Sequence, residues 1–395
     1  MQLRELATLL GINSYPEALE TVYKEQDTSD ELLCDEAFIA SLHEKYDLLG
    51  EYYDAVIAGA KDLKNKKNLL AWGRLAYAYS KDATRREASL MPMPPSDGSA
   101  AADMLPVLAL IREVPEMVKR YADRGFDEAQ IKKNLENIKI NIWVNEITRG
   151  RAALSQGLYQ WLAFYTKAMM FDHKGFSYQP TGWPPFSMVL KNKQSGEYVI
   201  LMVAGRFAKE GLVLGSAGVK EEEGSFDAAF AEDDDAFFGH RAKDGRVQPE
   251  LEKFEKTEWD AVLRHGDHVL NLHIPRKTNL APDYVTESLK EGLALARKHY
   301  PELAPKCIVC ESWLLDPKLI DILGPDAKLS QFINRFKKHP VMDATGTACL
   351  GFVWPGEVCA VSEYSEKTTL QRGIKKLMLE GGYIRGTSGI IVDDL

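Results

Sequence analysis

Residues 268–317 read HVLNLHIPRKTNLAPDYVTESLKEGLALARKHYPELAPKCIVCESWLLDP, and this stretch predicts a strand, a loop, a helix and a second strand. The first strand spans His268–His273, where apolar residues dominate, and it ends just before a proline. A helix follows from Pro282, a residue suited to the first helical turn. The second strand is predicted over Cys307–Leu315, and Asp316 then begins a short helix.

The residues on either side of this stretch continue the mixed pattern. Before it, the apolar runs Phe186–Leu190 and Tyr198–Ala204 flank a Ser-Gly turn and predict a β-hairpin. After it, the pattern predicts strands at Pro340–Asp343 and Ala348–Trp354, a helix at Leu370–Glu380 capped by Thr369, and a strand at Gly389–Val392.

The first 170 residues have a different composition, rich in Leu, Ala, Glu, Lys and Tyr. From Tyr46 to Tyr79 apolar residues recur at intervals of three and four, which indicates amphipathic helix with a break at Lys64–Lys67. Asp127 is typical of a helix start and Gly150 of a helix stop. The change near residue 170 predicts an all-helical domain at 1–170 and an α+β domain, a mixed sheet with flanking helices, at 171–395.

Composition excludes several classes of function. The chain has 395 residues, with 49 Lys and Arg against 58 Asp and Glu, which gives a net charge of −9. An acidic chain is poorly suited to nucleic acid or to an anionic membrane surface. Charges interrupt the N-terminal segment and no apolar run has the length of a membrane span, so we expect a cytoplasmic protein. The five cysteines, an odd and sparse set, do not indicate a disulfide scaffold.

Three phrases of the sequence carry a family resemblance: His273-Ile274-Pro275, CESWLLDP at Cys310–Pro317, and TTLQR at Thr368–Arg372. With these, the C-terminal part of the chain resembles a bacterial family of two-domain GNAT-like acyltransferases, and the predicted order of elements is that of GNAT enzymes. The resemblance implies a helical N-terminal domain followed by a GNAT-like mixed-sheet domain. It also implies acetyl-CoA or another acyl-CoA as co-substrate, and no metal.

In GNAT enzymes, the loop after the first of these strands and the start of the next helix hold the pyrophosphate of coenzyme A, because free N–H groups and the helix dipole favour an anion. The resemblance assigns that role to Ile274, Arg276, Lys277, Thr278 and Asn279. The usual loop contains glycines, whereas this one has none and offers charge and hydrogen bonds instead. An acidic residue in the first helical turn, Asp283, opposes a bound pyrophosphate.

The resemblance also assigns catalytic roles. Glu311 or His273 would take a proton from the attacking amine, since a carboxylate or a neutral imidazole is a suitable base near pH 7. Ser312 would donate a hydrogen bond to the thioester, and Tyr364 would protonate the thiolate that leaves. Each assignment has a structural alternative: His273 orients the loop that follows it, and Tyr364 is a surface residue.

Trp313 and Asp316 are candidate substrate contacts, with core packing and helix capping as the alternatives. Cys307 and Cys310 have the spacing of a metal or redox pair, but positions i and i+3 of a strand point to opposite faces, which favours structural thiols. Hydrolase, nucleotide-loop and zinc-protease motifs are absent from the sequence.

The sequence therefore predicts an N-acyltransferase that acts on a small-molecule or peptide amine. The alternative is a GNAT-shaped binding module that has lost catalysis and recognises a peptide or protein. The glycine-free loop and the acidic stretch Lys220–Asp235 are the features that favour the module. A thioester hydrolase using the same groups is the third hypothesis.

Overall fold

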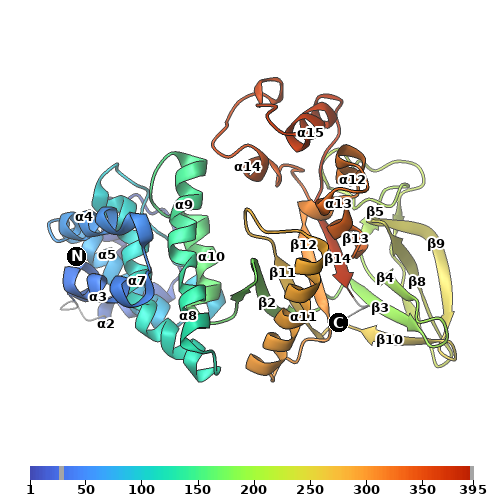
Figure 1. The fold of residues 1–395 in the computed structure, drawn as a ribbon, viewed down its shortest axis with the longest axis horizontal. Coiled ribbons are helices and arrows are strands. Elements are labelled where there is room, and N and C mark those ends of the chain that lie inside the picture. The colour runs from blue at the N-terminus through green and yellow to red at the C-terminus, as the bar shows by residue number, and fades with distance from the viewer. Residues whose placement is uncertain (26–30, 392–395) are drawn as a thin grey trace. The chain divides into compact units, whose positions relative to one another are not determined.

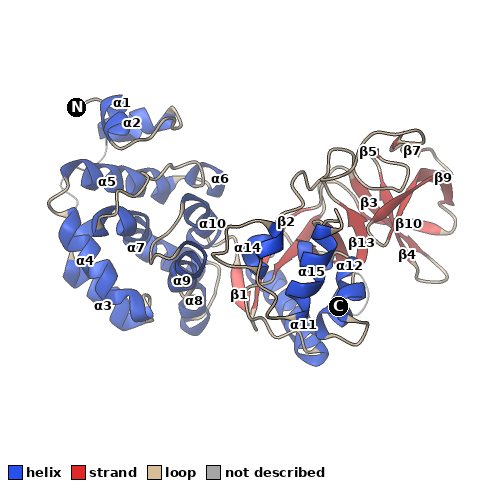
Figure 2. Cartoon of the chain, turned by 90° about the horizontal axis from the view of Figure 1, so that it is seen from above, coloured by secondary structure: helices blue, strands red, loops and turns tan. Residues whose placement is uncertain are grey.

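The computed structural model describes residues 1–25 and 31–391. The chain forms two compact units, Met1–Asp172 and His173–Leu395. Helices make up the first unit, whereas the second combines helices with strands (Figure 2). The fold class expected from the sequence is thus confirmed. Val392, the last residue of the final predicted strand, lies outside the described residues.

The first unit is built around one long buried helix. Its helices are α1 (Leu3–Leu9), α2 (Ala18–Glu25), α3 (Glu36–Tyr46), α4 (Tyr53–Leu63), α5 (Lys67–Asp82), α6 (Arg85–Ala88), α7 (Ala100–Asp123), α8 (Glu128–Leu135), α9 (Asn137–Arg149) and α10 (Gln156–Thr166). Helix α7 is buried over most of its length, and α4 and α5 pack on it. Glycines allow this close approach, because a Cβ at Gly59 would lie 2.5 Å from Met104 Cβ and one at Gly73 would lie 2.7 Å from Leu105 Cδ1.

The predicted helix boundaries in this unit have clear local causes. The periodic segment Tyr46–Tyr79 covers α4 and most of α5, which are separated at the lysine-rich break. Asp127 caps α8, since its carboxylate accepts the Gln130 N–H at 2.8 Å. Gly150 ends α9 in the left-handed conformation, with φ of 71°.

The first sheet is mixed and has the order β1-β2-β11-β12-β14-β13, with β1 at the boundary of the two units. The other five strands are labelled in Figure 1. Its strands are β1 (Phe171–His173), β2 (Phe176–Gly182), β11 (His268–His273), β12 (Ile308–Ser312), β14 (Thr387–Ile391) and β13 (Lys337–Pro340). Strands β11 and β12 run parallel, whereas β2 is antiparallel to β11, and β14 is antiparallel to both β12 and β13.

A second sheet packs against the first. It has the order β10-β3-β4-β8-β7, with β9 paired to β8. Its strands are β3 (Ser187–Asn192), β4 (Tyr198–Met202), β7 (Ala231–Glu232), β8 (Ala236–Lys243), β9 (Arg246–Glu255) and β10 (Trp259–Leu263), and a short pair, β5 (Arg206–Phe207) and β6 (Phe226–Asp227), lies apart from it. Antiparallel pairing of β3 with β4 confirms the predicted hairpin. Val309 and Ile390 of the first sheet share one apolar cluster with Val189 and Ile200 of the second.

Helices complete the second unit: α11 (Pro282–His299), α12 (Lys318–Leu323), α13 (Lys328–Ile333), α14 (Leu350–Val353) and α15 (Thr369–Leu379). Helix α11 packs on β2, where the Tyr178 hydroxyl donates to the Ser288 carbonyl at 2.8 Å. The other four helices share an apolar cluster that includes Trp313, Trp354 and Tyr364.

Two of the predicted strands were wrong: one segment forms a helix, and the other strand ends where it was predicted to begin. Residues 348–354 contain helix α14, because Cys349, Val353 and Trp354 are spaced to bury one helical face in the cluster of helices. Strand β13 ends at Pro340, and the chain then turns at Asp343, whose carboxylate accepts the N–H of Gly346 at 2.8 Å.

Candidate functional site

The parallel ladder between β11 and β12 is short. It pairs only Leu270 with Ile308 and Asn271 with Val309. Each strand nevertheless continues with its outer neighbour, β11 with β2 as far as His273 and β12 with β14 as far as Ser312. At their carboxyl ends, the two parallel strands β11 and β12 are therefore no longer paired with each other, although each is still paired with its outer neighbour. This is the position at which open sheets with helices collect ligands.

Two sequence-predicted catalytic residues lie at this point. His273 follows Asn271 by two positions and Glu311 follows Val309 by two, and Asn271 is paired with Val309. Because side chains alternate along a strand, His273 and Glu311 lie on the same face and at the same level of the sheet. Both candidate bases therefore lie just beyond the end of the ladder, one on each of the two parallel strands.

The surroundings shift the pKa values of the two groups in opposite directions. His273 Nε2 lies 2.9 Å from Gln179 Oε1 and 3.3 Å from Asn271 Nδ2. Burial lowers the pKa of His273 to about 4, so the imidazole is neutral at pH 7. The Glu311 side chain is exposed by its accessible surface, yet the protein crowded around its carboxyl removes hydration and raises its pKa. A carboxylate of raised pKa is a stronger base than a free one.

The predicted phosphate loop follows β11, and its backbone explains how it turns without glycine. Lys277 has a φ of 66°, in the left-handed region that glycine favours. A lysine there costs about 1–2 kcal/mol. The turn is held by Thr278, whose hydroxyl donates to the carbonyls of Pro275 at 2.7 Å and Gly175 at 2.8 Å.

The remaining loop residues also make contacts within the protein. Arg276 donates to the carbonyls of Phe352, at 3.0 Å, and Gly351 in α14, and its guanidinium lies 5.3 Å from the centre of the Phe352 ring. Asn279 accepts the N–H of Ala281 at 3.0 Å, and Ile274 is half-buried. Arg276 is therefore hydrogen-bonded to α14 rather than to an acidic residue of α11, the helix that follows the loop.

The other candidates have packing or capping positions. Ser312 Oγ accepts the N–H of Leu314 at 3.1 Å and so caps the turn after β12. Trp313 is buried, with its ring 6.1 Å from that of Phe352. Tyr364 is buried and stacks on Trp354 at 4.6 Å, so the expectation of a surface tyrosine was wrong. Burial raises the pKa of Tyr364, which keeps its phenol protonated.

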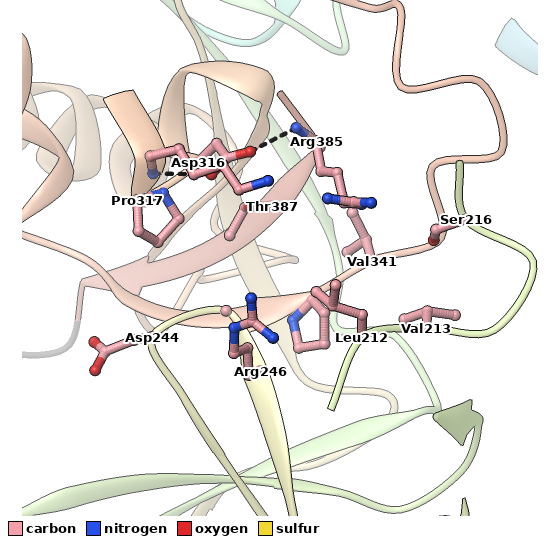
Figure 3. Close-up of a pocket in the computed structure, with 14 residues that line it drawn as sticks. Leu212, Val213, Ser216, Asp244, Arg246, Asp316, Pro317, Val341, Arg385 and Thr387 are labelled. Carbon is pink, nitrogen blue, oxygen red and sulfur yellow. Dashed lines mark hydrogen bonds between the residues drawn. The ribbon is translucent and has the colours of Figure 1, made fainter. Parts of the chain in front are cut away.

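A small cavity that sequence reasoning missed lies beside Thr387, at the start of β14 (Figure 3). Its volume is about 80 Å³. Asp316, the one lining residue predicted from the sequence as a site residue, accepts the backbone N–H groups of Lys318 at 3.0 Å and Arg385 at 2.6 Å. The other lining residues come from separate segments of the chain: Leu212, Val213, Ser216, Asp244, Gly245, Arg246, Pro317, Lys318, Pro340, Val341, Arg385, Gly386 and Thr387. The only signal in the sequence was the pair of basic residues, Arg246 and Arg385, each next to a glycine.

Two further properties bear on function. Among the described residues, no group of three or more His, Cys, Asp and Glu side chains is arranged to hold a metal ion. Within residues 1–25 and 31–391, no helix combines the length and the apolarity needed to cross a membrane.

Comparison with known proteins supports the same architecture. Residues 241–391 match the model of the GNAT-like C-terminal domain family. No curated protein sequence matches the chain.

Solved structures match over the whole length. An acyltransferase mutant in complex with octanoyl-CoA and an acyltransferase in complex with decanoyl-CoA and teicoplanin each give a TM-score of 0.67, at 15% and 16% identity, over 99% of both chains. An acyltransferase in complex with decanoyl-CoA gives a TM-score of 0.65 at 16% identity, again over 99% of both chains. At this identity the likeness establishes the fold. The chain therefore has the fold of these acyltransferases, a helical N-terminal part followed by a GNAT-like mixed sheet with helices, and its residues 241–391 match the GNAT-like C-terminal domain family.

Proposed function

We propose that this protein transfers an acyl group from acyl-CoA to an amine in the cytoplasm. The observation that carries the proposal is the placement of Glu311 and His273 on one face, where the ladder between β11 and β12 ends. The same fold occurs in acyltransferases solved with octanoyl-CoA and decanoyl-CoA, which supports an acyl-CoA as donor. Acetyl-CoA is the donor expected from the sequence, and longer chains are the alternative that these structures suggest.

The chemistry proposed is direct transfer. The amine nitrogen attacks the thioester carbonyl carbon, a C–N bond forms, and the nitrogen passes a proton to Glu311. The C–S bond then breaks, and the thiolate of coenzyme A leaves and takes up a proton, for which Tyr364 is the proposed donor. His273, held by Gln179, is the second candidate base. Ser312 is proposed to donate to the thioester, and Trp313 and Asp316 to contact the acceptor.

The loop after β11 is proposed to bind the phosphates of coenzyme A. Lys277 would contribute charge, and N–H groups of the loop and of the first turn of α11 would contribute donors. Arg276, Thr278, Asn279 and Ile274 shape the loop through the contacts already described. The acceptor is proposed to be a small-molecule or peptide amine, since teicoplanin is bound in one of the similar structures.

Binding of the donor is tested by thermal unfolding with acyl-CoAs of increasing chain length. A ligand at one hundred times its Kd should stabilise the protein by about 2.7 kcal/mol. The chain length with the largest shift would identify the donor. Absence of a shift with every acyl-CoA would refute acyl transfer.

The role of Glu311 is tested by Glu311→Gln, which keeps the size of the side chain and removes the base. With the identified donor and a panel of amines, we expect kcat to fall by about 10²–10⁴-fold, while acyl-CoA still stabilises the variant. Glu223→Gln, at an exposed position of the same unit, is the matched control and should leave kcat unchanged. Equal rates for the two variants would remove Glu311 from the mechanism.

A binding module without catalysis is the second candidate. The observation that favours it is the use of Arg276 and Thr278 in contacts with Phe352, Gly351, Pro275 and Gly175 rather than toward a phosphate. This candidate predicts no stabilisation by acyl-CoA. The same thermal measurement therefore separates the two functions.

A further inference from the structure

We infer that the cavity beside Thr387 binds a single oxyanion group, a carboxylate or a phosphate. The inference concerns a site separate from the ladder end at Glu311, and it does not depend on acyl transfer. Figure 3 shows Arg385 and Asp316 on one side of Thr387 and Arg246 on the other.

The cavity gathers three cationic side chains: those of Arg246, Lys318 and Arg385. Each one is held by a backbone carbonyl. Arg246 donates to Glu210 at 3.0 Å, Lys318 to Tyr383 at 3.0 Å and Arg385 to Ala217 at 2.6 Å. In the part of the chain that the structure describes, none of the three lies within 4.0 Å of a carboxylate oxygen. Their charges are therefore positioned without being neutralised by direct ion pairs.

The two carboxylates of the cavity, Asp316 and Asp244, do not form ion pairs with these three cations. Both oxygens of Asp316 are occupied by backbone N–H groups, those of Lys318 and Arg385. Burial raises the pKa of Asp316, so its surroundings weaken the charged form of this carboxyl group. Asp244 lies at the exposed mouth, on the turn between β8 and β9. An anion from solution would supply the missing charge.

One donor inside the site lacks a partner. Arg385 Nε is buried and, among the described residues, has no hydrogen bond. A buried guanidinium donor left unpaired is costly, and oxyanions pair with guanidinium groups through short, charge-assisted bonds. Leu212, Val341 and Pro317 supply apolar walls, which strengthen such a bond by excluding water.

The size of the cavity limits the ligand. A volume of about 80 Å³ accommodates one small group and is too small for an acyl chain or a nucleotide. Thr387 is paired with Ser312 across β14 and β12, so the bound group would lie about 5–10 Å from the carboxyl end of β12. The oxyanion would belong either to a free small anion or to an amine acceptor whose other end reaches Glu311.

The test measures thermal unfolding of the full chain in inorganic phosphate and in sodium chloride at equal ionic strength. We expect phosphate to stabilise the protein more than chloride. Arg246→Gln should weaken phosphate binding about tenfold, the effect of losing one charge-assisted bond. Arg246 is exposed, so the variant should fold, and Arg372→Gln on the exposed face of α15 is the matched control. Equal stabilisation by the two salts, or the same phosphate affinity in both variants, would overturn the inference.

A second variant and a second measurement locate the source of the anion. Arg385→Gln should weaken phosphate binding at least as much as Arg246→Gln, and unchanged affinity would again overturn the inference. In an acyl-transfer assay, phosphate should raise the KM of amines that carry a carboxylate if the group belongs to the acceptor, and should leave that KM unchanged if the site takes a free anion. Both outcomes support oxyanion binding. A protein that binds phosphate but no acyl-CoA would refute the proposed function and leave this inference intact.

Discussion

At the scale of single residues, His339 shows how burial determines a charge state. It lies on β13 with its ring at 6.2 Å from that of Trp183 and 6.1 Å from that of Phe186. Nδ1 lies 3.2 Å from the Pro340 carbonyl, and Nε2 is buried with no hydrogen bond among the described residues. Burial lowers the pKa of His339 from 6.5 to about 4. The folded chain therefore holds the imidazole neutral.

This depressed pKa predicts a pH-dependent stability. Between pH 6.5 and about 4 the unfolded chain binds a proton that the folded chain does not, so the free energy of unfolding falls as the pH falls. The loss attributable to His339 over this window is on the order of 3 kcal/mol. Urea unfolding at a series of pH values should show a flatter dependence in His339→Leu than in the natural protein.

The exposed His265 supplies the control for this measurement. His265→Leu should keep the pH dependence of the natural protein. If His339→Leu and His265→Leu give the same dependence, burial of His339 does not contribute as argued.

At the scale of elements, the contact between α11 and β2 depends on a missing side chain. A Cβ at Gly292 would lie 2.4 Å from Tyr178 Cζ, and Tyr178 is fully buried with its hydroxyl bonded to Ser288. Such a distance forces the helix or the ring to move. This glycine therefore sets how closely α11 approaches the sheet.

The close contact predicts that Gly292→Ala is destabilising, although alanine is the better helix former by about 1 kcal/mol. Overpacking of this kind costs about 1–3 kcal/mol. Chemical denaturation should therefore show a lower free energy of unfolding. The matched control is Gly182→Ala on β2, where no atom lies within 4 Å of the added Cβ. Its effect should stay within about 0.5 kcal/mol. A stabilised Gly292→Ala would contradict the close contact.

At the scale of the whole molecule, the two compact units are proposed to be independent domains. Each has its own buried core, around α7 in the first and between the two sheets in the second. We expect fragments 1–172 and 173–395 to fold separately, each with a cooperative thermal transition. Circular dichroism of the two fragments measures this.

A shorter fragment, 173–312, provides the control for that experiment. It lacks β13 and β14, so β12 loses its antiparallel partner and Ile390 leaves the core between the sheets. We expect this fragment to lack a cooperative transition. If 173–395 behaves like 173–312, the second unit does not fold alone.

The sequence predicted most of the fold because the signals involved are local. The strand His268–His273 and the helix from Pro282 have the predicted limits, since alternation and a first-turn proline act within a few residues. The strand predicted at residues 348–354 was wrong because a short apolar run fits either a strand or a helix until its packing partners are known. Here the partners are helices.

The candidate site was predictable in part for the same reason. Glu311 and His273 were found because both lie at the carboxyl ends of predicted strands, and their roles stay predictions. The cavity beside Thr387 was not found, because Arg246, Lys318 and Arg385 are assembled by the folding of the second unit. Distant residues of this kind leave no spacing that a single sequence reveals.

The short ladder between β11 and β12 has one more consequence. A sheet that stops pairing in its middle acquires two edges in its interior, one along Leu272–His273 and one along Cys310–Ser312. Unpaired strand edges are templates for β-augmentation, in which an extended chain adds its own amide groups to the ladder. An unpaired edge on the outside of a sheet can pair with strands of many unrelated chains. Here β11 and β12 are each paired on their other side, so a chain that used these edges would have to lie between the two strands.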